Sequence, residues 1–318
     1  MSITPGWTAT YQEMAPVSKI TVPEVEDMQI FISGQDMIYG ASAVYVLPGA
    51  NPYIKKNSFI ELYNKGSKAF TWKATTKDAW IKLSKTSGKT ALQERIIVSV
   101  DWSKAPKSNQ LTGEIEIASG NKTQKVFLPL FNPQTPTREE LKDMYVENNG
   151  CVSINTGRFH RKTENNDIKI SVVKGLGYEN ESIQLGEATK PSQNTWFTDK
   201  APKVEYDFYT FNAGNVTVHT YALPLFPIDS KHDTRYGIMI DNGMVQWMTT
   251  NAKEYSSHWR LNVSRNSAVS TINLNIDKPG KHTFKLICAD PGTIIQKVVI
   301  DFGGLKRSYL GPETTYVE

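Results

Sequence analysis

Four aromatic residues stand in or beside segments rich in Asn, Ser and Asp: Trp196, Trp247, Tyr255 and Trp259. A Trp or Tyr ring can stack on the C–H face of a pyranose, while neighbouring amides and carboxylates hydrogen-bond to the sugar hydroxyl groups. Trp196 is the candidate that we expect to be most exposed, because it lies within the polar residues 192–200. Trp259 begins an alternation over residues 259–263 that predicts a strand, with Trp259 in the core.

Hydrolysis and metal binding have less support in the sequence. Glycoside hydrolysis needs two carboxyl groups on opposite sides of the scissile bond, one of them with a raised pKa. Glu139 and Glu140 stand together where a helix should start, and Asp229 and Asp233 lie in a charged loop, so we expect no catalytic residue. The histidines are spread singly, so we expect no metal site and no cofactor: His160, His219, His232, His258 and His282.

Short strands are expected to position these residues. Residues 95–102 alternate between apolar and polar side chains, which is typical of a half-buried strand. Similar runs, separated by turn residues, recur through residues 41–131 and predict a β-sandwich. Trp72, Trp80 and Trp102 are expected to lie in its core.

The pattern changes after Phe131. Two prolines interrupt strand pairing, and Thr137 with Glu140 matches a capping box that predicts one short helix over about residues 138–145, the only helix we expect. We assign residues 132–150 to a linker that contains it. Alternation resumes in residues 151–318 and predicts a second, jelly-roll-like sandwich, with a hairpin-like turn at residues 212–215. Residues 1–40 show little periodicity and are expected to form an extended lead-in.

Composition limits the partners. The 318 residues suffice for two domains, and a net charge of +4 with scattered Lys and Arg argues against nucleic acid. No apolar run reaches the ~20 residues of a membrane helix, so we expect no membrane contact. The first residues lack the features of a signal peptide. Two cysteines form no disulfide framework, so buried free thiols are favoured over a disulfide between Cys151 and Cys288.

The end of the chain carries a family resemblance. The segment Ser308-Tyr309-Leu310-Gly311-Pro312 resembles the C-terminus of glycoside hydrolase family 115, the xylan α-1,2-glucuronidases. Other segments are similar to landmarks of that family's C-terminal module: Gly175-Leu176-Gly177-Tyr178, Arg235-Tyr236-Gly237 and Gly280-Lys281-His282. Residues 59–102 resemble the immunoglobulin-like module that precedes it, and also BACON-type accessory domains. The family's catalytic part lies N-terminal to everything that the resemblance covers.

The resemblance implies an all-β chain with an immunoglobulin-like (BACON-like) sandwich, a short helical linker and a jelly-roll, galactose-binding-like sandwich. It implies a non-catalytic C-terminal accessory region whose partner is the catalytic domain of a parent enzyme that is secreted or periplasmic. Xylan or glucuronoxylan oligosaccharides and a second copy of the chain, in a homodimer, are further partners that it implies.

The tail residues are then expected to lie in a groove as an interface segment: Ser308, Tyr309, Leu310, Gly311 and Pro312. Two alternatives stay open. An independent pair of carbohydrate-binding modules would need an exposed aromatic platform, and a free-standing glycoside hydrolase would need an acid pair.

Overall fold

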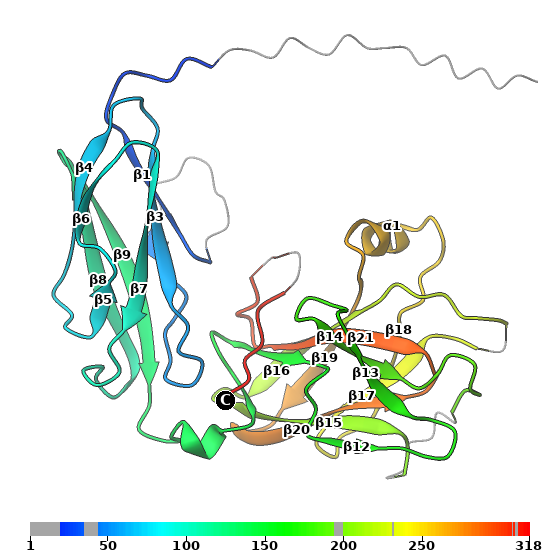
Figure 1. Cartoon of the computed structure of the whole chain (residues 1–318). Coiled ribbons are helices and arrows are strands. Elements are labelled where there is room, and N and C mark those ends of the chain that lie inside the picture. Colours follow the sequence, from blue (N-terminus) through cyan, green and yellow to red (C-terminus); the bar gives the residue numbers. More distant parts are fainter. Residues whose placement is uncertain (1–19, 35–43, 194–199, 231, 307, 309–310) are drawn as a thin grey trace, which may run out of the picture.

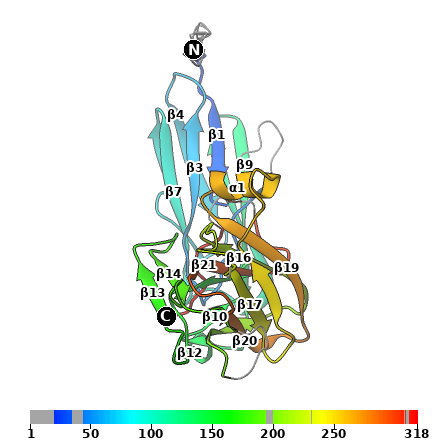
Figure 2. The ribbon, with the colours of Figure 1, turned by 90° about the vertical axis from the view of Figure 1, so that its right-hand side faces the viewer.

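The computed structural model describes residues 20–34, 44–193, 200–230, 232–306, 308 and 311–318. Within them almost all regular structure is β-strand, in four sheets of four, five, six and six strands. Two sheets enclose a core in residues 28–132 and two enclose a core in residues 145–301, as two bodies (Figures 1 and 2). The all-β class with two sandwiches, expected from the sequence, is confirmed.

The first sandwich packs a four-stranded sheet on a five-stranded sheet. The four-stranded sheet has the order β1 (Met28–Ile32), β3 (Ser58–Asn64), β7 (Gln93–Val100), β5 (Ile81–Leu83). The five-stranded sheet has the order β2 (Tyr45–Val46), β9 (Lys122–Asn132), β8 (Ser108–Ser119), β4 (Phe70–Thr76), β6 (Ser87–Thr90). Trp72 and Trp80 are buried in the shared core as expected, whereas Trp102 packs against its edge and stays partly exposed.

Strand β1 corrects the expected lead-in. It pairs antiparallel with β3, from Met28 opposite Asn64 to Ile32 opposite Ile60. Met28, Ile30 and Ile32 point into the core. The expectation of an extended segment over residues 1–40 is therefore wrong for residues 28–32. An edge strand with only three inward-facing residues is too short for its alternation to be recognised among prolines and turn residues.

The linker forms the predicted capping box but a shorter helix. Glu140 Oε2 accepts hydrogen bonds from Thr137 N at 2.6 Å and from Thr137 Oγ1 at 2.8 Å. The helix is a single 3₁₀ turn, η1 (Glu139–Leu141). The expected extent to residue 145 is wrong, because Asp143 adopts a left-handed φ of 57° and Tyr145 already belongs to β10.

The second sandwich contains two six-stranded sheets. One has the order β10 (Tyr145–Val146), β15 (Lys203–Thr210), β20 (Gly280–Cys288), β17 (Arg235–Ile240), β18 (Gln246–Thr249), with β12 (Arg161–Thr163) beside β15. The other has the order β13 (Ile170–Lys174), β14 (Glu181–Leu185), β21 (Thr293–Asp301), β16 (Gly214–Ala222), β19 (Ala268–Ile276), with β11 (Cys151–Asn155) beside β21. A helix that the sequence did not predict, α1 (Ser257–Ser264), precedes β19.

The turn at residues 212–215 does not form a hairpin. It joins β15 to β16, and these strands lie in different sheets. The turn is held by the buried carboxylate of Glu147, which accepts from Phe211 N at 2.8 Å and from Asn212 N at 2.9 Å. The expectation of a hairpin-like turn is wrong because local turn chemistry cannot distinguish a hairpin from a crossing between sheets.

The last residues of the chain bind the linker and the second sandwich. Thr315 N donates to Ser153 O, Val146 N to Thr315 O and Val317 N to Met144 O, each at 2.9 Å. Val317 is fully buried, with 0% exposure. It lies in a small apolar cluster to which the first sandwich, the linker and the tail all contribute: Tyr53, Leu141, Met144, Val146 and Val317. The tail therefore closes the junction between the modules.

Polar contacts complete this junction. Gly49 N donates to Asn149 Oδ1 at 2.9 Å, and Asn51 Nδ2 donates to Asn148 Oδ1 at 2.6 Å. A Cβ at Gly304 would lie 1.9 Å from Asn149 O, so the close approach of the two backbones requires glycine there. The glycines after the last strand thus allow the chain to reach the junction.

Both cysteines are buried free thiols, as the sequence favoured. Burial raises the pKa of the Cys288 thiol to about 12. Within the described residues, no helix is long and apolar enough to cross a membrane.

Candidate carbohydrate-binding site

The second sandwich has two ends. At one, the tail and linker form the junction. The register defines the other: β16 ends at Ala222 opposite Ala268, where β19 begins, and β17 begins at Arg235 opposite Thr249, where β18 ends. Asp290, which follows β20, hydrogen-bonds to Arg235 at the same place. We call this the distal end. It carries α1, which projects from the second sandwich apart from the first (Figure 1).

Tyr255 and Trp259 form an aromatic pair at the distal end. Their ring centroids are 5.3 Å apart and their planes are inclined by 50°. Tyr255 is 72% exposed and has a φ of 60°, a conformation that bulky residues rarely adopt. Ser256 caps α1 by accepting from Trp259 N at 3.1 Å, which fixes the spacing between the two aromatic residues. The pair offers an exposed surface on which a sugar ring can stack.

Trp259 is not a strand residue. It lies in the first turn of α1 and is half-buried, so the expectation of a strand with Trp259 in the core is wrong. Burial in this segment is opposite to what the alternation predicts. The polar Asn262 is only 2% exposed, whereas the apolar Leu261 and Val263 are 51% and 53% exposed. The good N-cap at Ser256 favours the helix over the weak alternation.

Trp247 lies on β18, opposite Gly237 of β17. Its ring covers the glycine, because a Cβ at Gly237 would lie 2.8 Å from Trp247 Cζ3. It is half-buried and covers the outer face of the sheet. Trp196, the candidate that we expected to be most exposed, lies outside the described residues. The structure therefore brings together two of the four aromatic candidates, Tyr255 and Trp259.

Two pairs of charged side chains lie beside the start of β17. The fully buried carboxylate of Asp290 accepts from Arg235 N at 2.9 Å and from Arg235 Nε at 2.7 Å. Burial raises the pKa of Asp290, but the hydrogen bonds from Arg235 more than offset this and hold it below its ordinary value. His232 Nδ1 lies 2.7 Å from Asp229 Oδ1, and this hydrogen bond raises the pKa of His232. Asp233 Oδ1 accepts from Thr234 N at 2.8 Å.

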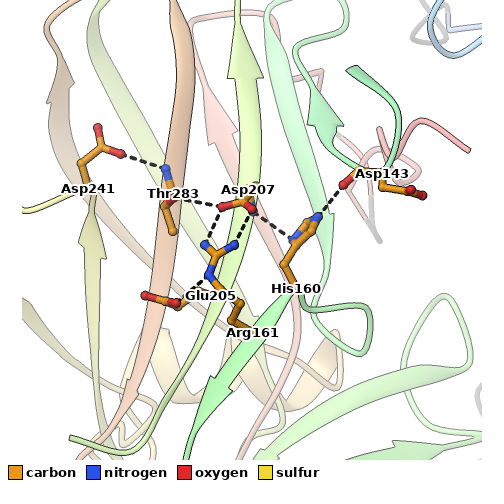
Figure 3. Close-up of polar contacts among 7 residues, drawn as sticks. All are labelled: Asp143, His160, Arg161, Glu205, Asp207, Asp241 and Thr283. Atoms are coloured by element: carbon orange, nitrogen blue, oxygen red, sulfur yellow. Dashed lines mark hydrogen bonds and ion pairs between the residues drawn. The ribbon is translucent and has the colours of Figure 1, made fainter. Parts of the chain in front are cut away.

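A second group of ionisable residues lies on the outer face of β12, β15 and β20 (Figure 3). Arg161 donates to both carboxylate oxygens of Asp207, at 2.5 and 2.6 Å, and its Nε donates to Glu205 at 2.9 Å. His160 Nδ1 accepts from Asp207 N, so its Nε2 donates to Asp143 O (Figure 3). Asp207 and Glu205 are thus held as ion-paired acceptors of Arg161. His160 joins the backbone of β15 to Asp143 of the linker.

A general acid needs a raised pKa, and each described carboxyl group with a resolved pKa shift has its pKa lowered: Glu61, Asp101, Glu140, Glu164, Asp207 and Asp290. Among the described residues, no group of three or more His, Cys, Asp or Glu side chains could hold a metal ion.

Of the tail candidates, the structure describes Ser308, Gly311 and Pro312. Pro312 O accepts from Ser153 Oγ at 3.0 Å and from Lys297 Nζ at 2.5 Å, and Gly311 has a left-handed φ of 72°. Ser308 is exposed, and Tyr309 and Leu310 lie outside the described residues. The anchoring side chain is Val317, which sequence reasoning missed because a single valine in a polar tail carries no pattern.

A cavity of about 180 Å³ lies beside the junction and was also missed. Its lining includes Lys55, Trp102, Lys107 and Arg138. These residues come from turns of the first sandwich and from the linker, so their spacing in the sequence gave no signal. Only the Trp102 segment, a tryptophan among Asp, Ser, Lys and Pro, could have drawn attention to it.

Comparison with known proteins settles the family. Residues 144–314, more than half of the chain, match the sequence model of the glycosyl hydrolase family 115 C-terminal domain. The chain therefore belongs to this family. Residues 51–130 of the family 115 chain match the viral BACON domain. Both resemblances expected from the sequence are confirmed. A search of curated proteins finds no match.

Several solved structures resemble parts of this family 115 chain. BtGH115A, described as a 4-O-methyl-α-glucuronidase with specificity for decorated arabinogalactans, is 20% identical over 46% of this chain and 17% of its own, with a TM-score of 0.38. The C-terminal CBM6 of LamC from Zobellia galactanivorans is 14% identical over 48% of this chain and 98% of its own, with a TM-score of 0.30. The CBM35 of Cellvibrio japonicus Abf62 is 13% identical over 47% and 91%, with a TM-score of 0.31. The chain thus spans a small part of BtGH115A, and none of these likenesses bears on its ligand.

Proposed function

We propose that this chain is a non-catalytic accessory region of a family 115 glycoside hydrolase, which braces a catalytic domain and contacts its polysaccharide. The match over residues 144–314 supports the family context. The single observation that carries the bracing role is the junction, where Val317 is buried among residues of the first sandwich and the linker. A unit closed by its own last residues can hold a neighbouring domain at a fixed distance and angle.

Xylan or a related polysaccharide is the proposed ligand, and the Tyr255–Trp259 pair is its proposed contact. Two aromatic rings whose centroids lie 5.3 Å apart can contact one or two sugar rings, and stacking needs no charge on the sugar. The left-handed backbone at Tyr255 supports this, because strained φ values persist where function requires them. Trp196 and Trp247 are further proposed sugar contacts.

The exposed face of α1 is the proposed contact for the catalytic domain. Leu261 and Val263 are both about half exposed on an eight-residue helix whose only buried residue is Asn262. Apolar side chains on the outside of a helix favour a protein neighbour over water. A second copy of the chain, as in the homodimer implied by the resemblance, would compete for the same face. Ser308 to Pro312 are proposed to assist the contact from the tail.

The test combines the chain with a separately produced catalytic region of its parent enzyme. Sedimentation velocity should show a one-to-one complex for the chain, and Leu261→Ser with Val263→Ser should weaken that complex about tenfold or more. Arg260→Gln, on the same helix, is the matched control and should bind as the parent chain does. A chain that self-associates and ignores the catalytic region would favour the homodimer and contradict bracing.

A second candidate function is an independent carbohydrate-binding module pair, favoured by the exposure of Tyr255. It predicts binding to glucuronoxylan in affinity electrophoresis by the chain alone, lost in Tyr255→Ala and kept in Tyr178→Ala. The accessory role predicts that the same binding strengthens in the presence of the catalytic region. Neither function predicts hydrolysis, so chromatography should detect no uronic acid released from decorated oligosaccharides by the chain alone.

A further inference from the structure

Strand β19 forms one edge of its six-stranded sheet and runs down one side of the second sandwich (Figure 2). Its nine residues pair with β16 in one unbroken register, from Ala268 opposite Ala222 to Ile276 opposite Gly214. The backbone of β19 makes no hydrogen bond to a described strand other than β16. The other side of β19 therefore presents N–H and C=O groups that can pair with a further strand.

The other strands at sheet edges are shorter. They have two to five residues each: β1, β2, β5, β6, β10, β11, β12, β13 and β18. Some carry a lysine, as at Lys82 in β5, Lys89 in β6 and Lys174 in β13. The edge at β10 is covered by the tail, because Val146 N donates to Thr315 O. Short length, charge and cover are the usual protection against unwanted strand pairing, whereas β19 is long and contains no charged residue and no proline.

Inward-facing side chains of β19 are also incompletely covered. Ile272 lies opposite the buried Val218, and Leu274 lies opposite the buried Val216, so both point into the sandwich. Both pack against the core but are only half-buried. Met248, on the edge strand β18 of the facing sheet, is half-buried as well. The core is thus open along this side, and a strand added to β19 would cover Ile272 and Leu274 and gain stability from their burial.

The outward-facing side chains of β19 are neutral. Thr271, Asn273 and Asn275 are exposed, and their hydroxyl and amide groups can both donate and accept hydrogen bonds across a pair of strands. The flanking charges in the sequence, Arg265 and Asp277, lie outside the strand. A strand of the same composition would therefore meet no like charge directly opposite its own residues. A second copy of β19 fulfils this condition.

We propose that the free edge of β19 pairs antiparallel with β19 of a second copy of this chain, about a twofold axis at Ile272. All nine residues pair in this register, and any shift along the strand shortens the overlap. Ile272 then lies opposite its own copy, and Thr271 lies opposite Asn273 of the second copy. Inward side chains meet inward ones and outward meet outward, because the register preserves the side-chain period of two.

The twofold contact closes on itself, so the assembly stops at a dimer with one continuous sheet across both copies. Main-chain hydrogen bonds would supply the affinity, as in other contacts made by strand addition. The inference uses β19 and not the exposed face of α1. It therefore does not rest on the proposed accessory role.

Sedimentation equilibrium of the full chain, over about 1–200 μM, tests the pairing. The parent chain should show monomer and dimer in a ratio that depends on concentration, because one pair of strands is a small interface. Thr271→Lys with Asn273→Lys places four lysines around the axis and should weaken dimerisation about tenfold or more. Both side chains are exposed, so the fold should stay intact. Thr75→Lys with Gln110→Lys, at exposed strand positions of the first sandwich, adds the same charge and should keep the dimer.

Cysteine cross-linking tests the register. Thr271→Cys and Asn273→Cys are made in separate chains, which are then mixed and oxidised. A disulfide should form between the two variants, because directly opposed residues of an antiparallel pair lie within disulfide reach. Cross-linking of either variant with itself should be weaker, since those pairs are out of register. Cys151 and Cys288 are buried and should stay reduced.

Several results would overturn the proposal. A parent chain that stays monomeric over the whole range would do so, and so would a lysine variant that dimerises as the parent chain does. Larger oligomers in place of a dimer would show a head-to-tail contact, and stronger self-cross-linking would exclude the twofold axis at Ile272. If Leu261→Ser with Val263→Ser abolishes the dimer while the lysine variant keeps it, the second copy binds at α1 and this inference fails. A dimer that the lysine variant disrupts, in a chain that ignores the catalytic region, would support this inference and contradict the proposed function.

Discussion

The two ends of the second sandwich differ in how they treat apolar side chains. At the junction a single tail valine, Val317, is completely buried and three backbone hydrogen bonds hold the residues around it. At the distal end, Leu261 and Val263 stay about half exposed while a polar residue, Asn262, is buried beneath them. Both segments are short and carry little regular pattern. Apolar side chains are therefore buried at the junction, where they stabilise the fold, and are left exposed to solvent at the distal end.

The difference in burial between the two ends indicates that a contact with a partner is expected at the distal end. Burying an apolar side chain stabilises a protein by about 1.5–3 kcal/mol, so leaving two of them exposed forgoes stability that a different sequence would gain. A free-standing module gains nothing from that arrangement, whereas one that contacts a neighbour does. The predictions below compare the two ends through free energies of unfolding, from the largest expected effect to the smallest.

Deleting everything after Arg307 should have the largest effect. It removes the burial of Val317 and the backbone hydrogen bonds to Ser153 and Met144, which together should contribute about 4–6 kcal/mol to stability. Urea denaturation should show this loss in the free energy of unfolding. Thermal denaturation should show a Tm that is lower by about 10–20 °C. Glu318→Gln, an exposed terminal residue, is the control. A truncated chain that melts at the parent temperature would mean that the tail does not stabilise the junction.

Asp290→Asn should have the next largest effect, this time at the distal end. The substitution leaves Arg235 without its buried bidentate partner and should cost about 2–4 kcal/mol. The folded-state pKa of Asp290 is depressed, so its contribution is present above the unfolded pKa of about 3.9 and is lost as the pH falls through the folded value. The urea midpoints of the two proteins should therefore converge at low pH. A constant gap down to the acid transition would contradict this assignment.

Glu147→Gln tests the junction by replacing one carboxylate oxygen with an amide nitrogen. The carboxylate accepts from Phe211 N, Asn212 N and the Asn212 side chain, and an amide cannot accept all three. We expect a loss of about 1.5–3 kcal/mol in the free energy of unfolding. Glu139→Gln, exposed in the nearby linker, should change stability by less than about 0.5 kcal/mol. Equal effects of the two substitutions would mean that the turn between the sheets does not depend on Glu147.

Much of the fold could be predicted from the sequence, because alternation with period two reports directly on a half-buried sheet. The burial of Ile96 and Val98 and of the core strand from Lys203 to Thr210 follows that pattern. The prediction fails where the patterned segment is short: β1 has only three inward residues. It also fails at the end of η1, because the left-handed backbone of Asp143 is not required by any helix propensity. Sheet assignment across residues 212–215 also depends on tertiary packing and cannot be read locally.

The candidate site was predicted in part. Aromatic residues in polar segments indicated Tyr255 and Trp259, and the structure places their rings together. The helix that carries Trp259 was missed because the alternation over residues 259–263 indicated a strand, and the capping residue Ser256 was the only sign of a helix. The junction cavity could not be predicted at all, since Lys55, Trp102, Lys107 and Arg138 meet only when the turns of the first sandwich fold against the linker. Charge clusters assembled from distant turns leave no periodic trace.

The smallest effect is expected from Tyr255→Asn, and its sign is the sharpest comparison between the ends. A tyrosine at a φ of 60° stores strain that Asn accommodates, and its ring is mostly exposed, so the substitution should raise the free energy of unfolding by about 0.5–1 kcal/mol. The same change should weaken binding to glucuronoxylan, because it removes one face of the aromatic pair. Leu261→Ser is the stability control and should stay within about 0.5 kcal/mol of the parent chain. Gain of stability together with loss of binding would show that the distal end gives up stability for contact; a tyrosine whose removal destabilises the fold would place it with Val317, among residues that hold the chain together.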